Sequence, residues 1–64
     1  SKLRIIQDII SDLQKQTGKE VAMSDVEAQA EEQGIESGKI KDVIERLKRE
    51  GLIYEPKPGY IKRT

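Results

Sequence analysis

The sequence predicts a small α+β domain, a winged helix-turn-helix in which three helices pack on a small antiparallel sheet in the order α-β-α-α-β-β. Two observations lead to this fold class. Apolar residues recur at intervals of three and four in two long segments, and this is the helical period. From Gly38 to Arg63, a helical pattern runs into a glycine and then into two β-prone runs on either side of a Pro-Lys-Pro-Gly turn. That arrangement is typical of a helix followed by a hairpin.

The first helix is predicted from residue 3 to the residue before Gly18. Its apolar stripe consists of Leu3, Ile6, Ile9, Ile10 and Leu13. Gly18 is suited to end the helix in a left-handed conformation. Residues 19–23 are too few for a helix and carry Val21 and Met23 in alternation, so we expect a short extended segment that pairs with the C-terminal hairpin as a third strand.

The second helix is predicted to begin at Ser24 and to stop near Gly34. Ser24 and Glu27 have the spacing of a capping box, in which each side chain accepts a hydrogen bond from the other residue's backbone N–H. The apolar face is thin, with Val26 and Ala30. Such small residues let a neighbouring helix approach closely.

The third helix follows a short link, residues 34–37, in which we expect Ile35 to be buried and Ser37 to act as a second N-cap. Its core positions have the spacing i, i+3, i+4, i+7; they are Ile40, Val43, Ile44 and Leu47. Gly51 ends this helix. Residues 52–54 and 60–62 are then the predicted strands of the hairpin, with the prolines and glycine between them fixing the turn.

Composition limits the function classes that this chain can serve. With 64 residues it is one domain, residues 1–64, and its core contributes roughly 3 to 5 kcal/mol at most. It has no cysteine and no histidine, so disulfides and the usual transition-metal sites are excluded, and we expect no cofactor and no enzyme activity. No apolar run has the roughly 18 residues of a membrane span. We therefore expect a monomeric, soluble domain in the cytoplasm and not at a membrane.

Two motifs carry a resemblance to a known family. They are LKREG at residues 47–51 and IYEPKPGY at residues 53–60. On these motifs the chain resembles the C-terminal winged-helix domain of archaeal minichromosome maintenance (MCM) replicative DNA helicases. The resemblance implies a C-terminal fragment of a longer, hexameric, ATP-binding helicase, placed behind its AAA+ motor. In that setting it implies a non-catalytic module, associated with the nucleoid of a prokaryote, that regulates the motor and contacts replication initiator proteins or DNA.

Charge is distributed unevenly although its sum is zero. Residues 38–64 hold eight basic and four acidic residues, whereas residues 19–37 hold one basic and six acidic residues. The candidate contacts to DNA phosphates are Lys39, Lys41, Lys57, Lys62 and Arg63. With so few contacts, we expect weak, salt-dependent and non-specific DNA binding, with a dissociation constant of roughly 10⁻⁴ M or weaker.

The outward face of the third helix argues against sequence-specific recognition. On a helical wheel it consists of Asp42, Glu45, Arg46 and Arg49. We expect Asp42 to pair with Arg46 and Glu45 with Arg49, at i, i+4 spacing. The first turn offers no Asn, Gln or Arg to read base edges. The alternative function, a DNA-binding winged helix of a transcription regulator, remains second, and an enzyme is third because no residue constellation supports acid-base or nucleophilic chemistry.

Two further groups of residues are candidates for protein docking. One is the acidic side of the second helix, with Glu27, Glu31 and Glu32; the alternative is a solvated face. The other consists of Tyr54 and Tyr60, which we expect to form a cross-strand pair or to cover the base of the hairpin. Their alternative role is as stacking platforms for single-stranded bases.

Overall fold

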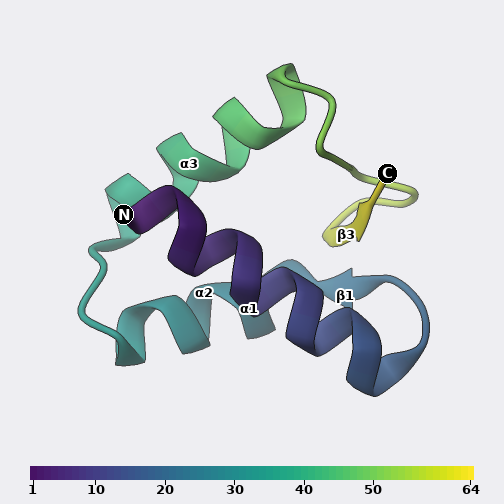
Figure 1. The fold of residues 1–64 in the computed structure, drawn as a ribbon, viewed down its shortest axis with the longest axis horizontal. Helices are drawn as coiled ribbons and strands as arrows, with labels where there is room; N and C mark the ends of the chain where they lie inside the picture. The colour runs from purple at the N-terminus through teal and green to yellow at the C-terminus, as the bar shows by residue number, and fades with distance from the viewer.

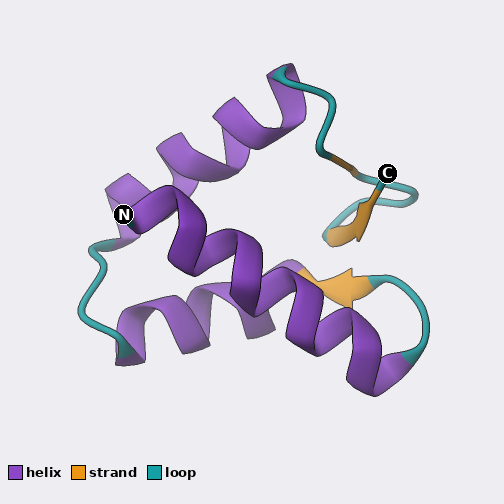
Figure 2. Ribbon diagram, viewed as in Figure 1, coloured by secondary structure: helices purple, strands orange, loops and turns teal.

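The winged helix-turn-helix fold is confirmed by a computed structural model, which describes residues 1–64. The elements are α1 (Lys2–Thr17), β1 (Val21–Ala22), α2 (Met23–Glu32), α3 (Ser37–Arg49), β2 (Ile53–Tyr54) and β3 (Tyr60–Arg63). In Figure 1, α1 crosses between α2 below and α3 above, and it contacts both. Figure 2 shows the strands gathered at the end of the molecule opposite the α2–α3 link. No helix has the length and apolar character needed to cross a membrane.

The sheet joins the two ends of the chain. Its strand order is β1-β3-β2, and both pairs are antiparallel. Val21 lies opposite Ile61 in β3, and Ile53 lies opposite Arg63. The expected third strand is therefore confirmed. Val21, Ile53 and Ile61 are buried, so one face of the sheet covers the helices.

The core consists of 14 buried residues, all of them apolar. The predicted core positions of α3 are all buried, and those of α1 are buried except Leu3, which is partly exposed. Ile35 in the α2–α3 link is buried as expected. Because the core contains no polar side chain, every charged group is available at the surface for contacts.

Helices α2 and α3 end in the same type of hydrogen-bonded turn. At the end of α3, the N–H of Leu52 donates to the carbonyl of Leu47, and the N–H of Gly51 donates to that of Lys48, both at 3.0 Å. Gly51 has a φ of +74°, a left-handed conformation that glycine adopts without steric cost. The end of α2 at Gly34 has the same two bonds. These turns set the directions in which α3 and the hairpin leave the helices.

Both predicted N-caps are wrong by one or two residues. Helix α2 begins at Met23 after Ala22, and no side chain caps it, so Ser24 and Glu27 form no capping box. The reason is tertiary: the N–H of Met23 donates to the carbonyl of Gly59 at 2.8 Å, which lets the helix start directly at the end of β1. Likewise, α3 begins at Ser37 itself, after Glu36 and without a side-chain cap.

Candidate protein and nucleic-acid interface

Lys48 and Glu55 connect α3 to the wing, which is the loop of residues 55–59 between β2 and β3. Lys48 Nζ lies 2.9 Å from Glu55 Oε1, and the N–H of Gly59 donates to Glu55 Oε2, also at 2.9 Å. One carboxylate therefore holds the helix and the far end of the wing together. Lys48 Nζ also lies 3.6 Å from Glu45 Oε2.

These contacts shift both ionisation equilibria. The hydrogen bond from Lys48, with that from the Gly59 N–H, holds the pKa of Glu55 below its ordinary value. The hydrogen bond to Glu55 raises the pKa of Lys48, against the opposing effect of desolvation. Because each group favours the charged form of the other, the pair stays ionised at neutral pH.

The outward face of α3 is paired in part within the domain, but not in the predicted combinations, and Asp42 and Arg49 have no ion-pair partner. Arg46 Nε lies 3.0 Å from Glu50 Oε2, and Glu45 contacts Lys48. The predicted pairs of Asp42 with Arg46 and of Glu45 with Arg49 are not formed. Two of the bases on this helix are thus neutralised within the domain.

The five candidate phosphate contacts do not form one patch. Lys39 and Lys41 are exposed in the first turns of α3 and have no ion-pair partner, whereas Lys57 and Lys62 lie on the wing and β3. In Figure 1 the start of α3 and the wing lie at opposite ends of that helix. The acids Asp42 and Glu45 lie between them along the helix.

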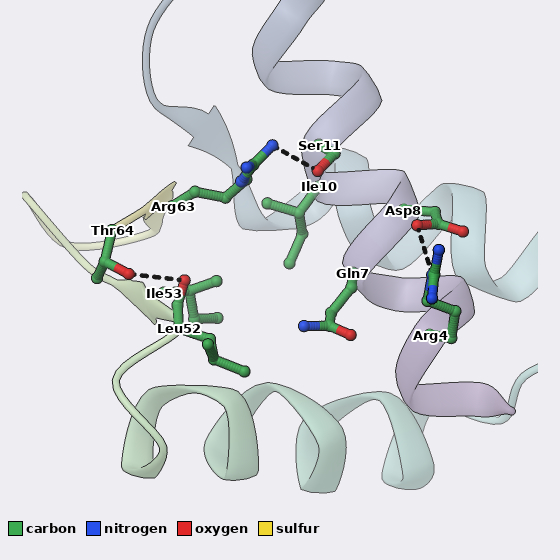
Figure 3. Close-up of a pocket in the computed structure, with 9 residues that line it drawn as sticks. All are labelled: Arg4, Gln7, Asp8, Ile10, Ser11, Leu52, Ile53, Arg63 and Thr64. Carbon is green, nitrogen blue, oxygen red and sulfur yellow. Dashed lines mark hydrogen bonds and ion pairs between the residues drawn. The ribbon is translucent and has the colours of Figure 1, made fainter.

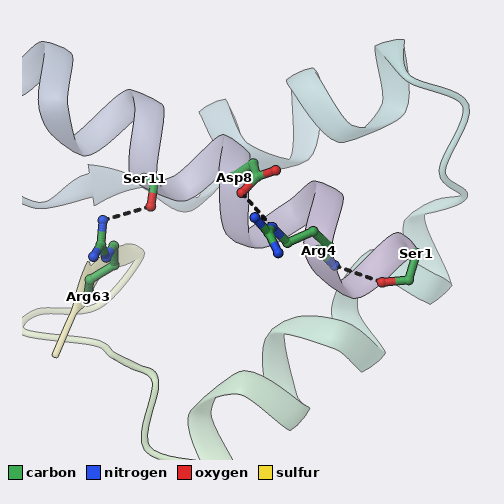
Figure 4. A network of polar contacts seen from close by, with 5 residues as sticks. All are labelled: Ser1, Arg4, Asp8, Ser11 and Arg63. Carbon is green, nitrogen blue, oxygen red and sulfur yellow. Dashed lines mark hydrogen bonds and ion pairs between the residues drawn. The ribbon is translucent and has the colours of Figure 1, made fainter.

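Arg63 is held against α1. Its Nη1 donates to Ser11 Oγ at 2.7 Å, and its backbone N–H donates to Gln14 Oε1 at 2.9 Å. Figure 4 shows the guanidinium pointing at Ser11. It therefore contacts a helix that is remote from the outward face of α3.

The two tyrosines of the wing are exposed, Tyr54 by 44% and Tyr60 by 36%. They are not cross-strand partners, because Tyr54 lies opposite Lys62 and Tyr60 lies opposite Ala22. The predicted cross-strand pair is therefore not one of directly opposite residues. Strand alternation instead places both on the outer face of the sheet in diagonal positions. Lys57 Nζ lies 4.4 Å from the centroid of the Tyr60 ring, a cation–π contact that covers part of that ring.

The acidic docking candidates lie on α2. Glu31 and Glu32 are exposed and Glu27 is partly buried. None of the three takes part in an ion pair within the domain. Their charges are therefore uncompensated by any close base.

Comparison with known protein families assigns this chain to one of them. A family model described as the MCM protein C-terminal winged helix-turn-helix domain matches residues 3–63, which is nearly the whole chain. The chain belongs to this family. No curated protein and no solved structure matches the chain at a significant level.

This MCM winged-helix domain has features that sequence reasoning missed. The bridge from Lys48 through Glu55 to Gly59 was not predicted, although an acid and a base of fitting reach flank the turn at Gly51. The N-cap of α1 was missed as well: the N–H of Arg4 donates to Ser1 Oγ at 3.2 Å. The available signal is that Ser1 directly precedes the first residue of the helical pattern, where serine is a preferred N-cap.

The surface of the MCM winged-helix domain offers no ready metal site. No group of three or more Asp, Glu, His or Cys side chains is arranged to hold a metal ion. What the surface offers is charge and shape: bases at the two ends of α3, acids on α2, and exposed tyrosines on the wing.

Proposed function

We propose that this domain is a non-catalytic regulatory module of an archaeal replicative MCM helicase, acting on the AAA+ motor and on replication initiator proteins through protein contacts. The observation that carries the proposal is the outward face of α3, on which the acids Asp42 and Glu45 balance the bases Arg46 and Arg49, in a chain of the MCM winged-helix family. In a winged helix that reads a groove, this face carries free bases and amides toward the bases of DNA. Here Arg46 and Lys48 are committed to acids of the same domain.

The proposed contact surfaces are the acidic side of α2 and the outer face of the wing. Glu27, Glu31 and Glu32 suit a basic surface on a partner, because they have no intramolecular bases to displace. Tyr54 and Tyr60 supply exposed aromatic area of the kind enriched at protein interfaces.

DNA contact is a secondary part of this proposal. The proposed phosphate contacts are Lys39, Lys41, Lys57 and Lys62. The first two lie in the first turns of α3, and the other two lie in the wing and in β3. The start of α3 and the wing are at opposite ends of that helix (Figure 1). Such a division supports weak, non-specific binding and not a continuous track along the backbone. The family match favours this role over that of a transcription regulator.

The deciding experiment compares full-length helicase with helicase truncated before residue 3 of this domain. We expect the rates of ATP hydrolysis and of duplex unwinding to change on truncation, with the hexamer intact by sedimentation. Unchanged rates of both would contradict a regulatory role.

A double variant tests the α2 surface inside the full-length helicase. Glu31→Lys/Glu32→Lys reverses two exposed charges, so the fold is retained while contact with a basic partner surface weakens. We expect its rates to move toward those of the truncated helicase. The matched control is Asp12→Lys/Glu20→Lys, which reverses two acids that lie outside α2 and have no ion-pair partner. This control is expected to leave the rates as in the wild type. Equal rates in both variants and the wild type would remove the α2 surface from the proposal.

A further inference from the structure

A cleft of about 390 Å³ opens between α1 and the C-terminal end of the chain. One wall comes from α1 and the other from the start of β2 and the end of β3, as Figure 3 shows. Its lining residues are Arg4, Gln7, Asp8, Ile10, Ser11, Leu52, Ile53, Arg63 and Thr64. The volume lies within the range of small-ligand sites, roughly 300 to 1,000 Å³.

The apolar part of this cleft includes an exposed leucine, Leu52. Leu52 is 41% exposed, and it is the only exposed leucine, isoleucine or valine of the domain. Its backbone is fixed on both sides: its N–H donates to the carbonyl of Leu47, and its carbonyl accepts from the N–H of Thr64 at 3.3 Å. Ile10 and Ile53 are buried beside it. The cleft therefore offers one exposed apolar side chain on a fixed backbone, and no part of the domain covers it.

The charged part of the cleft has one base without an acid. Arg4 Nε is paired with Asp8 Oδ1 at 3.2 Å, whereas Arg63 has no carboxylate partner. The bonds from Arg63 to Ser11 Oγ and Gln14 Oε1 fix its orientation (Figure 4) and leave other guanidinium N–H groups free. An arginine that is already oriented loses less conformational entropy when it binds a carboxylate.

We propose that this cleft binds a peptide segment of a partner protein in which an apolar side chain lies next to a carboxylate. The apolar side chain packs on Leu52, and the carboxylate accepts hydrogen bonds from Arg63. A nucleic-acid backbone fits less well, because it offers no apolar group to pack on Leu52. The inference rests on the proposed role in protein contacts and names a second surface and the chemistry of its partner.

The test follows backbone amide shifts of the 64-residue domain by NMR as defined probes are added. The probe is the capped peptide acetyl-Leu-Asp-Leu-Asp-Leu-amide; the control peptide has Asn in place of both Asp residues, and a third probe is a ten-nucleotide thymidine oligonucleotide. We expect saturable shifts confined to residues 4–11, 51–53 and 63–64, with a dissociation constant on the order of 1 mM. The Asn peptide is expected to bind about tenfold more weakly, which corresponds to about 1.4 kcal/mol.

Variants separate a binding role from a structural one. Arg63→Gln is expected to remove the preference for Asp over Asn, and Leu52→Gln to weaken both peptides, while the control Lys19→Gln changes neither. The amide spectra of each variant report whether the fold is retained. No saturable shift at the cleft, an equal response to both peptides, or larger cleft shifts with the oligonucleotide would each overturn the proposal. If truncation still alters the helicase rates in that case, the proposed function stands and the cleft alone is refuted.

Discussion

Lys48 on α3 and Glu55 at the start of the wing lie 2.9 Å apart between Nζ and Oε1, and the same carboxylate accepts the backbone N–H of Gly59. The wing of this domain is therefore attached to the helix that precedes it by a charged pair. A surface pair contributes little to global stability. Its effect is on the position of the wing relative to α3.

The first prediction concerns the pH dependence of this attachment. The pKa of Glu55 is lowered in the folded state, so its contribution is present above the unfolded value and is lost as pH falls through the folded pKa. The pKa of Lys48 is raised, so its contribution is present below the unfolded value and is lost as pH rises through the folded pKa. The wing is thus expected to be most firmly attached between these limits.

An NMR titration of the Glu55 side-chain carboxyl carbon measures the acid limb. In Lys48→Met the midpoint is expected to move to higher pH than in the wild type, because the main cause of the lowered pKa is removed. Lys39→Met, which removes an unpaired lysine of the same helix, is expected to leave the midpoint unchanged. Identical midpoints in all three proteins would show that Lys48 does not hold Glu55.

The second prediction concerns the core. Leu47 is fully buried, and Leu47→Ala is expected to cost about 2 to 5 kcal/mol of unfolding free energy. This is comparable with the whole stability that a core of this size supplies, about 3 to 5 kcal/mol, so the variant is expected to be largely unfolded. Ile61→Val removes one methyl group from a fully buried position and is expected to cost about 0.5 to 1.5 kcal/mol.

Urea denaturation followed by circular dichroism measures these costs. The surface control is Lys41→Ala, which is exposed and has no ion-pair partner, and it is expected to stay within about 0.5 kcal/mol of the wild type. A Leu47→Ala midpoint equal to that of the control is incompatible with the described core.

The third prediction compares two glycines that differ only in backbone conformation. A methyl group added at Gly18 or at Gly38 meets no atom within 4 Å. Gly18 has a φ of +74°, so Gly18→Ala is expected to lose about 1 to 2 kcal/mol. Gly38 lies in the first turn of α3, so Gly38→Ala is expected to gain about 0.5 to 1 kcal/mol. Thermal melting of the two variants should therefore shift in opposite directions; shifts of the same sign would contradict this assignment of the helix ends.

The fourth prediction concerns DNA. The wild-type domain is expected to bind labelled duplex with a dissociation constant of roughly 10⁻⁴ M or weaker near physiological salt, without sequence preference. Lys39→Ala/Lys41→Ala is expected to flatten the dependence of log K on log salt by up to about 2, since each phosphate contact adds about 0.9 to the slope. The control Lys15→Ala/Lys19→Ala removes two lysines outside α3 and is expected to leave the slope unchanged. Sub-micromolar, sequence-dependent binding at about 150 mM salt would rule out the weak, non-specific mode.

Local patterns predicted the fold and most of its core. The apolar spacing of α1 and α3 identified the buried positions, because helical periodicity depends on neighbours three and four residues away. The ends at Gly18, Gly34 and Gly51 were predictable for a similar reason, since a left-handed residue is a local requirement. The start of α2 was not, because the N–H of Met23 is satisfied by Gly59, far along the chain.

Ion pairing on the face of α3 was predicted, but its individual partners were not. Arg46 has an acid four residues away on each side, Asp42 and Glu50, and spacing alone favours the first, whereas the structure has the second. The position of Lys48 depends on Glu55 of the wing, which no helical wheel contains. The sequence therefore predicts that the charged face of a helix forms ion pairs, but it does not predict which residues pair with each other.

The sequence by itself determined the order of elements, the apolar faces and the lack of net charge, all of which follow from short-range spacing and composition. Only the tertiary structure decided where Arg63 lies. Pairing of β3 with β1 brings the end of the chain to α1, and Arg63 thereby reaches Ser11, 52 positions away. A contact of that separation depends on how the sheet closes against the helix, so the cleft beside Leu52 becomes visible only in the folded domain.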